Sequence, residues 1–425
     1  MKLILNGSIA LLVLTLSAAA DTPAKKTKSK PVAAAAVSST GSEAAASTNG
    51  SAPKSTRKPE VDVSYQELAV LYKSKENPVI QKFSLYGEFS AQWADGVSNQ
   101  GPFGSRNLPP TPATSSLPGT PSTLWDDVDA RRWRLGVRAQ LFNVFKFTGI
   151  IDINPNWDPF YRDIYELYLS YAPSDAFNLS VGKRKAHFFS QEYNTPSREL
   201  IVFEQSVLTA TLIPKELTGV WVNGRIGNWF YAVAAYPGDY ETEFSRFDAG
   251  LVTQASLGHD FASKLNADQA LVRFDWQAST SCRNSYGPQD FSNAFSLNTA
   301  FQKGRFYSYT DFIGGIGRGH QGDVWGVILT PTYFLTHKLQ AVLRYQYTHG
   351  ANDSLKLQTR YEALAGDIKS TKFTGSDYNA AYFGLNYYIH RHNLKLMTGV
   401  EYGNMAGGQN DFSGWTYLAG LRLAF

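Results

Sequence analysis

The sequence predicts an all-β fold: a 16-stranded antiparallel transmembrane β-barrel with short periplasmic turns and long external loops. Three observations carry this prediction. From about residue 79 onward, apolar or aromatic side chains alternate with polar or small ones, which is the period of a β-strand. Sixteen such segments follow one another, and the connections between them alternate between short and long. The chain is also rich in Tyr (24), Phe (26), Trp (9) and Gly (35), which favour pleated strands and tight turns.

Composition excludes several other classes. After the first 20 residues, no run approaches the roughly 20 apolar residues that a membrane-spanning helix needs. Cys282 is the single cysteine, so no internal disulfide can form, and no Cys/His quartet has the spacing of a structural zinc site. We therefore expect no metal and no cofactor, and His390 and His392 are interpreted as part of a polar turn.

The N-terminal region is predicted to direct export and then to act as a tether. Residues 1–20 have the lysine, the apolar stretch and the small-residue end of a signal peptide, and a buried helix is the alternative. Residues 21–60 are rich in Ala, Ser, Lys and Pro and are expected to be a disordered periplasmic tail. Residues 61–78 are expected to include a short periplasmic helix, because Tyr65, Leu68 and Tyr72 share one helical face. The barrel is assigned to residues 79–425.

The positive charge of the chain lies in this tail. Of 40 basic and 36 acidic residues, residues 1–60 hold eight and three, which leaves 32 and 33 in residues 61–425. The basic tail is interpreted as a solvated linker, with contact to an acidic cell-wall polymer as the alternative. No nucleic-acid partner is expected.

The sixteen predicted strands are 80–94, 130–142, 144–154, 162–172, 175–184, 217–226, 228–236, 246–258, 268–278, 294–302, 305–314, 324–334, 337–348, 380–389, 393–404 and 415–425. Tight turns such as Asn143 and Gly227 alternate with long connections such as 95–129 and 185–216. Only the 259–267 connection breaks the alternation. With both termini in the periplasm, every long loop falls outside, as in outer-membrane barrels.

The alternation also predicts what each face of the wall contacts. In the last strand, Trp415, Tyr417 and Leu421 share the face expected to meet lipid, whereas Thr416 and Arg422 lie on the other. Backbone groups in hydrocarbon must all be paired, so such strands must close into a barrel. A water-facing sandwich or β-helix is the alternative. We therefore expect the chain in the bacterial outer membrane, in contact with outer-membrane lipid.

The same alternation of inward and outward side chains predicts a basic lumen. In the second strand Trp133, Leu135 and Val137 face lipid, which turns Arg132, Arg134 and Arg138 inward. The other predicted inward basic residues are Lys82, Lys146, Arg184, Arg225, Arg273, Arg344, Lys395 and Arg422. The predicted inward acids are Glu88, Asp152, Glu166, Asp275 and Glu401. A net positive lumen favours anions over cations. The alternative is that these charges pair with one another and leave a wide pore without preference.

A barrel of this size needs a constriction before it can select ions. The third external loop is the candidate, because it is long and carries aromatic residues that could pack it against a wall. The basic residues assigned to this constriction are Lys183, Lys185, His187, Arg198 and Lys215. A loop lying over the outer mouth is the alternative.

Three stretches resemble the phosphate-selective porin O and P family. They are RRWRLGVRAQLFNVFKFTGIIDIN (131–154), RDIYELYLSYAPSDAFNLSVGKRKAHFF (162–189) and YFGLNYYIHRHNLKLMTGVEY (382–402), and Phe425 resembles the terminal aromatic residue of outer-membrane barrels. The resemblance implies a trimeric channel with an arginine ladder, carried here onto Arg132, Arg134 and Arg138. A proline usually follows the family's Gly-basic stretch, whereas this chain reads Ala186-His187.

The expected function is therefore a porin for passive diffusion of small anions, with phosphate or similar oxyanions suggested by the resemblance. No reaction is expected, because no nucleophile and base converge in the pattern. The alternatives are a non-selective general porin and a structural or adhesive barrel without channel activity. The glycine-rich stretch from Gly317 to Gly322 precedes another strand rather than a helix, so it is interpreted as a loop.

Overall fold

The computed structural model describes residues 69–99, 101–104, 128–155, 157–186, 188–212, 216–237, 243–244, 250–280, 290–357, 361–362, 373–408 and 411–425. The chain divides into two compact units, residues 1–40 and 41–425, and every described residue belongs to the second. The predicted signal peptide and tail lie outside the described residues.

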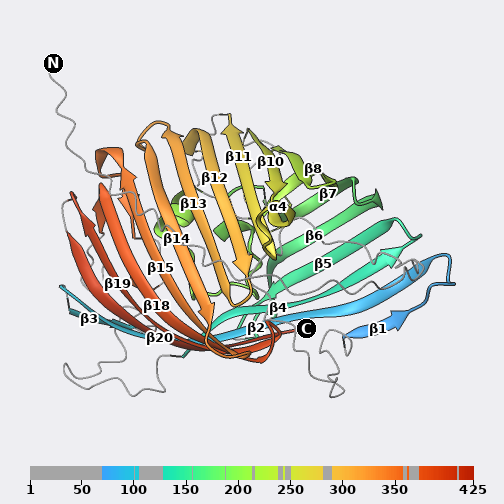
Figure 1. The fold of residues 1–425 in the computed structure, drawn as a ribbon, viewed down its shortest axis with the longest axis horizontal. Helices are drawn as coiled ribbons and strands as arrows, with labels where there is room; N and C mark the ends of the chain where they lie inside the picture. The colour runs from blue at the N-terminus through green and yellow to red at the C-terminus, as the bar shows by residue number, and fades with distance from the viewer. Residues whose placement is uncertain are drawn as a thin grey trace, which may run out of the picture. The chain divides into compact units, whose positions relative to one another are not determined.

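Sixteen strands form the wall of a closed antiparallel β-barrel. They are β2 (Ile80–Ser98), β4 (Val128–Leu141), β5 (Phe145–Ile153), β6 (Tyr161–Ser174), β7 (Phe177–Lys185), β8 (Glu216–Ile226), β9 (Trp229–Pro237), β10 (Leu251–Asp260), β11 (Gln269–Ser279), β12 (Phe291–Lys303), β13 (Phe306–Gly317), β14 (Val324–Phe334), β15 (Leu339–Gly350), β18 (Asp377–His390), β19 (Leu394–Ala406) and β20 (Phe412–Ala424). Each pairs with the next along the chain, and β2 pairs with β20 to close the ring. Figure 1 shows β2, in blue, beside β20, in red.

The predicted strands agree with the observed ones in number and order, which confirms the fold class. The main differences are at the external ends, where strands such as β2, β18 and β20 run several residues beyond their predicted limits. The irregular connection 259–267 contains the short helix α4 (Ala262–Leu265). No helix in the described ranges is long and apolar enough to cross a membrane.

The predicted helix over 61–78 is wrong where the structure describes it. Val70–Lys73 forms strand β1, which pairs antiparallel with β2 near Ser84. Ala69 accepts a hydrogen bond from the Leu85 amide at 2.8 Å, and Phe425 accepts one from the Gly87 amide at 3.1 Å. Strand β1 therefore continues the line of β20 along the edge of β2. An unpaired edge attracts a partner strand, and this partner overrides the helical period.

Strand β3 (Gly101–Gly104) plays a similar part at the external end, where it pairs with residues 95–98 of β2. Two short strands, β16 (Leu355–Lys356) and β17 (Thr374–Gly375), pair with each other in the connection between β15 and β18. The 3-10 helix η2 (Ala351–Asp353) precedes β16.

The outer face of the wall carries the apolar residues that the period predicts. Along β18, Phe383, Leu385 and Tyr387 alternate with buried inward residues, and Asp377 and Asn379 lie at the external end of the same outward row. Many large apolar side chains stay exposed on this face, including Leu343 at 52% and Trp415 at 46%. An apolar band that ends in polar residues is typical of a barrel in a bilayer.

Candidate functional site

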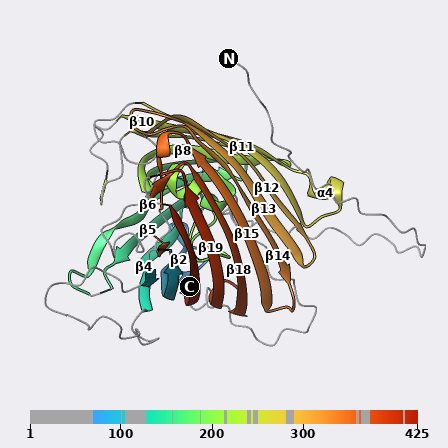
Figure 2. The same ribbon diagram turned by 90° about the vertical axis from the view of Figure 1, so that its left-hand side faces the viewer.

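The connection between β7 and β8 folds into the barrel and fills much of its interior. It contains two short helices, α2 (Gln191–Asn194) and α3 (Val207–Leu212). Phe189, Val202 and Leu208 are fully buried in one apolar cluster with inward residues of the wall. Helix α2 contacts β13, and α3 contacts β14 and β15. Figure 2 shows this green segment within the ring of strands. The connection between β7 and β8 therefore folds into the barrel and does not lie over its outer mouth.

Two buried carboxylates hold the start of this inward loop through its backbone. Asp311 on β13 accepts hydrogen bonds from the Gln191 and Glu192 amides at 2.7 and 2.8 Å. Asp275 on β11 accepts one from the Ser190 amide at 2.9 Å. Both carboxylates have no exposed surface. Carboxylate acceptors are stronger than neutral ones, so these bonds fix α2 against the wall.

Buried cations hold the middle of the loop through its carbonyl oxygens. The Arg422 guanidinium donates to four of them, those of Ser197, Leu200, Val202 and Phe203, at 2.7 to 3.2 Å. Lys395 Nζ donates to the Leu200 carbonyl at 2.7 Å. Two residues predicted for the anion pathway therefore contact the loop backbone.

Two further predicted pathway residues lie in ion-paired clusters. Arg344 contacts Glu192 at 3.0 Å and Glu401 at 2.7 Å, and it also donates to the Glu204 carbonyl. Arg273 contacts Asp275 at 2.8 Å. Both guanidinium groups are almost fully buried.

The three arginines of the predicted ladder lie along β4. Arg134 contacts Asp152 at 2.6 Å and Glu88 at 3.3 Å, and its guanidinium carbon is 3.4 Å from the centroid of the Tyr165 ring. Arg138 stacks over Tyr86 at 4.6 Å. Arg132 is 9% exposed.

A fourth arginine of β4, Arg131, also reaches the interior, although the alternation of the strand does not predict it. The register between β2 and β4 shifts between Ser90 and Ala91, so that Ser90 opposes Arg132 and Ala91 opposes Ala130. This bulge leaves Arg131 without an opposite residue and lets two successive side chains reach the interior. Strict alternation assigns Arg131 to the lipid face, and no local sequence signal reveals the bulge.

Arg131 and Arg132 share one carboxylate of the inward loop. Arg131 makes a bidentate contact with Glu204 at 2.7 and 3.0 Å, whereas Arg132 approaches it only to 3.8 Å. Burial raises the pKa of the Glu204 carboxyl, but Arg131 and Arg132 outweigh burial and hold this pKa well below its usual value. Glu204 is therefore ionised at neutral pH, and its charge is directed mainly at Arg131.

The other predicted pathway residues lie on separate parts of the wall. Arg184 on β7 stacks over Tyr168 at 5.0 Å and Trp221 at 5.1 Å. Arg225, near the periplasmic turn after β8, contacts Asp260 at 3.7 Å. Lys146 is half-buried on β5, and Lys82 is exposed near the start of β2.

The residues assigned to the constriction are brought together only in part. Lys183 and Lys185 belong to the end of β7 and not to the loop, because β7 runs to Lys185. Lys185 reaches the loop by donating to the Thr195 carbonyl at 3.3 Å and by lying 4.3 Å from the centroid of the Tyr193 ring. Arg198 lies in the loop and contacts Glu199 at 3.3 Å. His187 and Lys215 lie outside the described residues.

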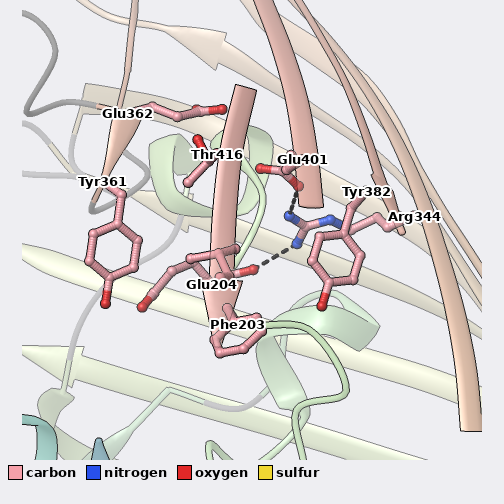
Figure 3. A pocket seen from close by; sticks show the side chains of 9 residues that line it. Phe203, Glu204, Arg344, Tyr361, Glu362, Tyr382, Glu401 and Thr416 are labelled. Carbon is pink, nitrogen blue, oxygen red and sulfur yellow. Dashed lines mark hydrogen bonds and ion pairs between the residues drawn. The ribbon is translucent and has the colours of Figure 1, made fainter. Parts of the chain in front are cut away.

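A small pocket opens between the inward loop and strands β15, β18, β19 and β20 (Figure 3). It is lined by Phe203, Glu204, Arg344, Tyr361, Glu362, Tyr382, Glu401, Thr416 and Leu418. In the figure, Arg344 points to Glu401 on one side and to the backbone of Glu204 on the other. Three carboxylates and one guanidinium line the pocket, so this side of the interior is not basic.

Comparison with known proteins agrees with this architecture. The model of the family described as phosphate-selective porin O and P matches residues 124–286. These residues run from just before β4 into the connection after β11 and include the ladder and the inward loop. No curated protein matches the chain.

Solved structures with the same fold are remote in sequence. The outer membrane channel DcaP of Acinetobacter baumannii is 15% identical, with 83% of this chain and 99% of that chain covered and a TM-score of 0.51. Salmonella typhi OmpF is 10% identical, with 84% and 100% covered and a TM-score of 0.52. Pseudomonas putida OprB is 9% identical, with 81% and 94% covered and a TM-score of 0.51. The family match and the fold together support a channel in the bacterial outer membrane, rather than an enzyme.

Proposed function

We propose that this chain is an outer-membrane porin through which small anions, phosphate or similar oxyanions among them, diffuse passively along a basic strip of the lumen. The proposal includes assembly as a homotrimer, export by residues 1–20 and a tether formed by residues 21–60, with no catalysed reaction. The predicted pathway residues are retained as candidates, with Arg138 and Arg184 placed first.

The observation that carries the proposal is a set of arginine side chains on the inner wall that stack on aromatic rings. Arg138 and Arg184 lie 4.6 and 5.0 Å from the ring centroids of Tyr86 and Tyr168. Stacking fixes a guanidinium in place without neutralising its charge. Fixed positive charge along a low-dielectric wall lowers the free energy of a passing anion.

A second candidate, the non-selective general porin, is favoured by the ion pairs. Arg134, Arg273 and Arg344 each contact at least one carboxylate within 3.0 Å. A paired guanidinium contributes much less field to the lumen than an unpaired one. The two candidates therefore differ in how many inward cations act on a permeating ion.

The reversal potential of the purified protein in a planar bilayer under a KCl gradient separates these candidates. An anion-selective potential, with chloride current blocked by added phosphate, supports the proposal. Conductance without selectivity leaves the general porin. The absence of any conductance favours the structural or adhesive barrel.

Arg184→Gln tests the stacked arginines. It removes a positive charge for which no carboxylate lies within 4 Å in the described part of the chain, so anion preference should fall roughly two- to fivefold. Arg305→Gln is the matched control, because Arg305 is exposed in the turn between β12 and β13 and is not among the pathway residues. Equal reversal potentials for wild type and Arg184→Gln would remove Arg184 from the pathway.

A further inference from the structure

Four inward residues stand in one row across the seam where the barrel closes. Lys395 on β19 opposes Arg422 on β20, Arg422 opposes Ser90 on β2, and Ser90 opposes Arg132 on β4. The exposed fractions are 0% for Lys395, 2% for Arg422, 1% for Ser90 and 9% for Arg132. Directly opposed residues on one face of a sheet have Cβ atoms about 5 Å apart. Two guanidinium groups therefore flank a single hydroxyl group, and Lys395 lies beyond Arg422.

Three polar atoms in the centre of this row lack a hydrogen-bond partner among the described residues. They are Arg132 Nη1, Arg422 Nε and Ser90 Oγ, and each is buried. Ser90 Oγ bonds to neither guanidinium, although both arginines are its register neighbours. Nitrogen atoms of arginine only donate, so the two guanidinium groups require an acceptor that the described residues do not supply.

The charge of the row is compensated only at a distance, by Glu204 and Glu88. In the described residues, no carboxylate lies within 4 Å of Arg422 or Lys395, whose contacts with the inward loop are carbonyl oxygens. Arg132 has only Glu204, at 3.8 Å, and Glu204 is already engaged by Arg131 at 2.7 Å.

The next carboxylate along β2 does not serve this row. Glu88 Oε2 accepts from Arg134, Tyr86 and Ser197, and Glu88 Oε1 accepts from no described donor, so neither oxygen bonds to Arg132 or Arg422. A buried charge without a partner is strongly destabilising, so a counter-ion is expected here. A water molecule would satisfy the hydrogen bonds but not the charge.

We propose that a small inorganic anion, a halide or a tetrahedral oxyanion, binds at Ser90 between Arg132 and Arg422. The anion accepts hydrogen bonds from Arg132 Nη1, Arg422 Nε and Ser90 Oγ. Because the other nitrogens of Arg422 bond to loop carbonyls from Ser197 to Phe203, the anion connects the inward loop to β2, β4 and β20. It is a resident ion that holds the loop, so Arg132 and Arg422, which are pathway candidates in the proposed function, act here on the loop and not on permeating ions.

Anomalous diffraction provides the direct test. Crystals of the full chain are grown without halide, phosphate or sulfate and are soaked separately in bromide and in selenate, which distinguish a halide from a tetrahedral oxyanion. A peak between Ser90 Oγ and both guanidinium groups is expected in at least one soak, at hydrogen-bond distance for bromide and one Se–O bond farther away for selenium. Direct Ser90–arginine bonds, or a water molecule without an anomalous peak in either soak, would overturn the proposal.

A solution measurement tests the same site in detergent. The melting temperature of the wild-type barrel should rise saturably when chloride or phosphate replaces a bulky organic anion at constant ionic strength. Ser90→Ala removes one donor, and it should raise the half-saturating anion concentration about tenfold. Ser180→Ala is the matched control, because Ser180 is a buried serine on β7 that already bonds to Ser170 at 2.6 Å.

The results that contradict the anion site differ from those that contradict the proposed function. If Ser90→Ala and Ser180→Ala give the same half-saturating concentration, the site is contradicted even in an anion-selective channel. A non-selective channel with the anomalous peak would contradict the proposed function and retain the site.

Discussion

At the scale of single residues, the effect of an inward arginine depends on what its guanidinium contacts. Arg344 and Arg134 bond to carboxylates, Arg422 bonds to backbone carbonyls, and Arg184 lies between aromatic rings. Of these environments, the last is the one in which no described carboxylate or carbonyl oxygen contacts the guanidinium. The basic residues of the wall therefore divide into those that support the structure and those that act on ions.

Arg134→Gln should destabilise the barrel more than it changes ion preference. The substitution leaves Glu88 and Asp152 without their shared cation, and removing one partner of a buried pair costs about 3–5 kcal/mol. Urea titration of the refolded barrel, followed by tryptophan fluorescence, measures the free energy of unfolding. Arg134→Gln combined with Glu88→Gln should recover part of the loss, and no recovery would show that the pair does not act as a unit.

The sequence predicts the inward arginines of β4 from alternation alone, because Trp133 and Leu135 establish the lipid-facing phase. It does not predict their partners. Cross-strand contacts depend on register, and a single bulge at Ser90 brings Arg131 into the interior. The roles of Arg422 and Lys395 were also inaccessible, because their partners are carbonyl groups of a loop whose path is not encoded in a periodic pattern.

At the scale of elements, the inward loop is held largely by its backbone. Carboxylates on β11 and β13 accept from its amides, and cations on β19 and β20 donate to its carbonyls. The wall strands were predictable because each repeats a period of two for about ten residues or more. The loop was not, since its position depends on contacts across the lumen that are remote in sequence.

Asp311→Asn should loosen the loop. The amide replaces two charge-assisted acceptor contacts, to Gln191 and Glu192, by at most one neutral contact, at a cost of about 2 kcal/mol. The population of a released loop should then rise roughly 30-fold, with larger and noisier single-channel currents. Asp268→Asn is the control, because exposed Asp268 also accepts from a backbone amide, that of Gly304, but in a turn. Unchanged currents for Asp311→Asn would show that this anchor is dispensable.

The contact between Gly87 on β2 and the Phe425 ring leads to a further prediction. A Cβ atom on Gly87 would lie 2.3 Å from Cζ of Phe425, so Gly87→Val must displace the terminal ring. Overpacking of this kind costs about 1–3 kcal/mol, and the temperature at which the folded band disappears in a gel-shift assay should fall. Gly314→Ala is the control, since its nearest contact would be at 3.8 Å. Equal transition temperatures for the two variants would show that the Phe425 ring adds nothing to closure.

At the scale of the whole molecule, the barrel carries an apolar exterior and a filled interior. The exterior was predictable, because the outward phase of each strand is visible in the sequence. The extent of filling was not, because it required knowing that one connection packs Phe189, Val202 and Leu208 against the opposite wall.

Leu343→Arg should impair insertion into lipid. Leu343 faces outward within the apolar band and is 52% exposed, and an arginine near the bilayer midplane costs about 2–4 kcal/mol. The free energy of folding into vesicles of short-chain phosphatidylcholine measures the effect. His349→Arg lies on the same face of β15 at its external end, where the cost falls to about 0–1 kcal/mol. Equal costs at the two positions would contradict the proposed depth of the band.

The meeting of β1 and β20 determines where the protein can be extended. Ala69 bonds to Leu85, and Phe425 bonds to Gly87, so Ala69 occupies the second position beyond Phe425 along β2. Any residues added after Phe425 would have to turn away from the wall, because the edge that could pair with them is already taken. An affinity tag or a fluorescent reporter fused at this point would compete with β1 for the same backbone, and insertion into an external connection is the better position for a label.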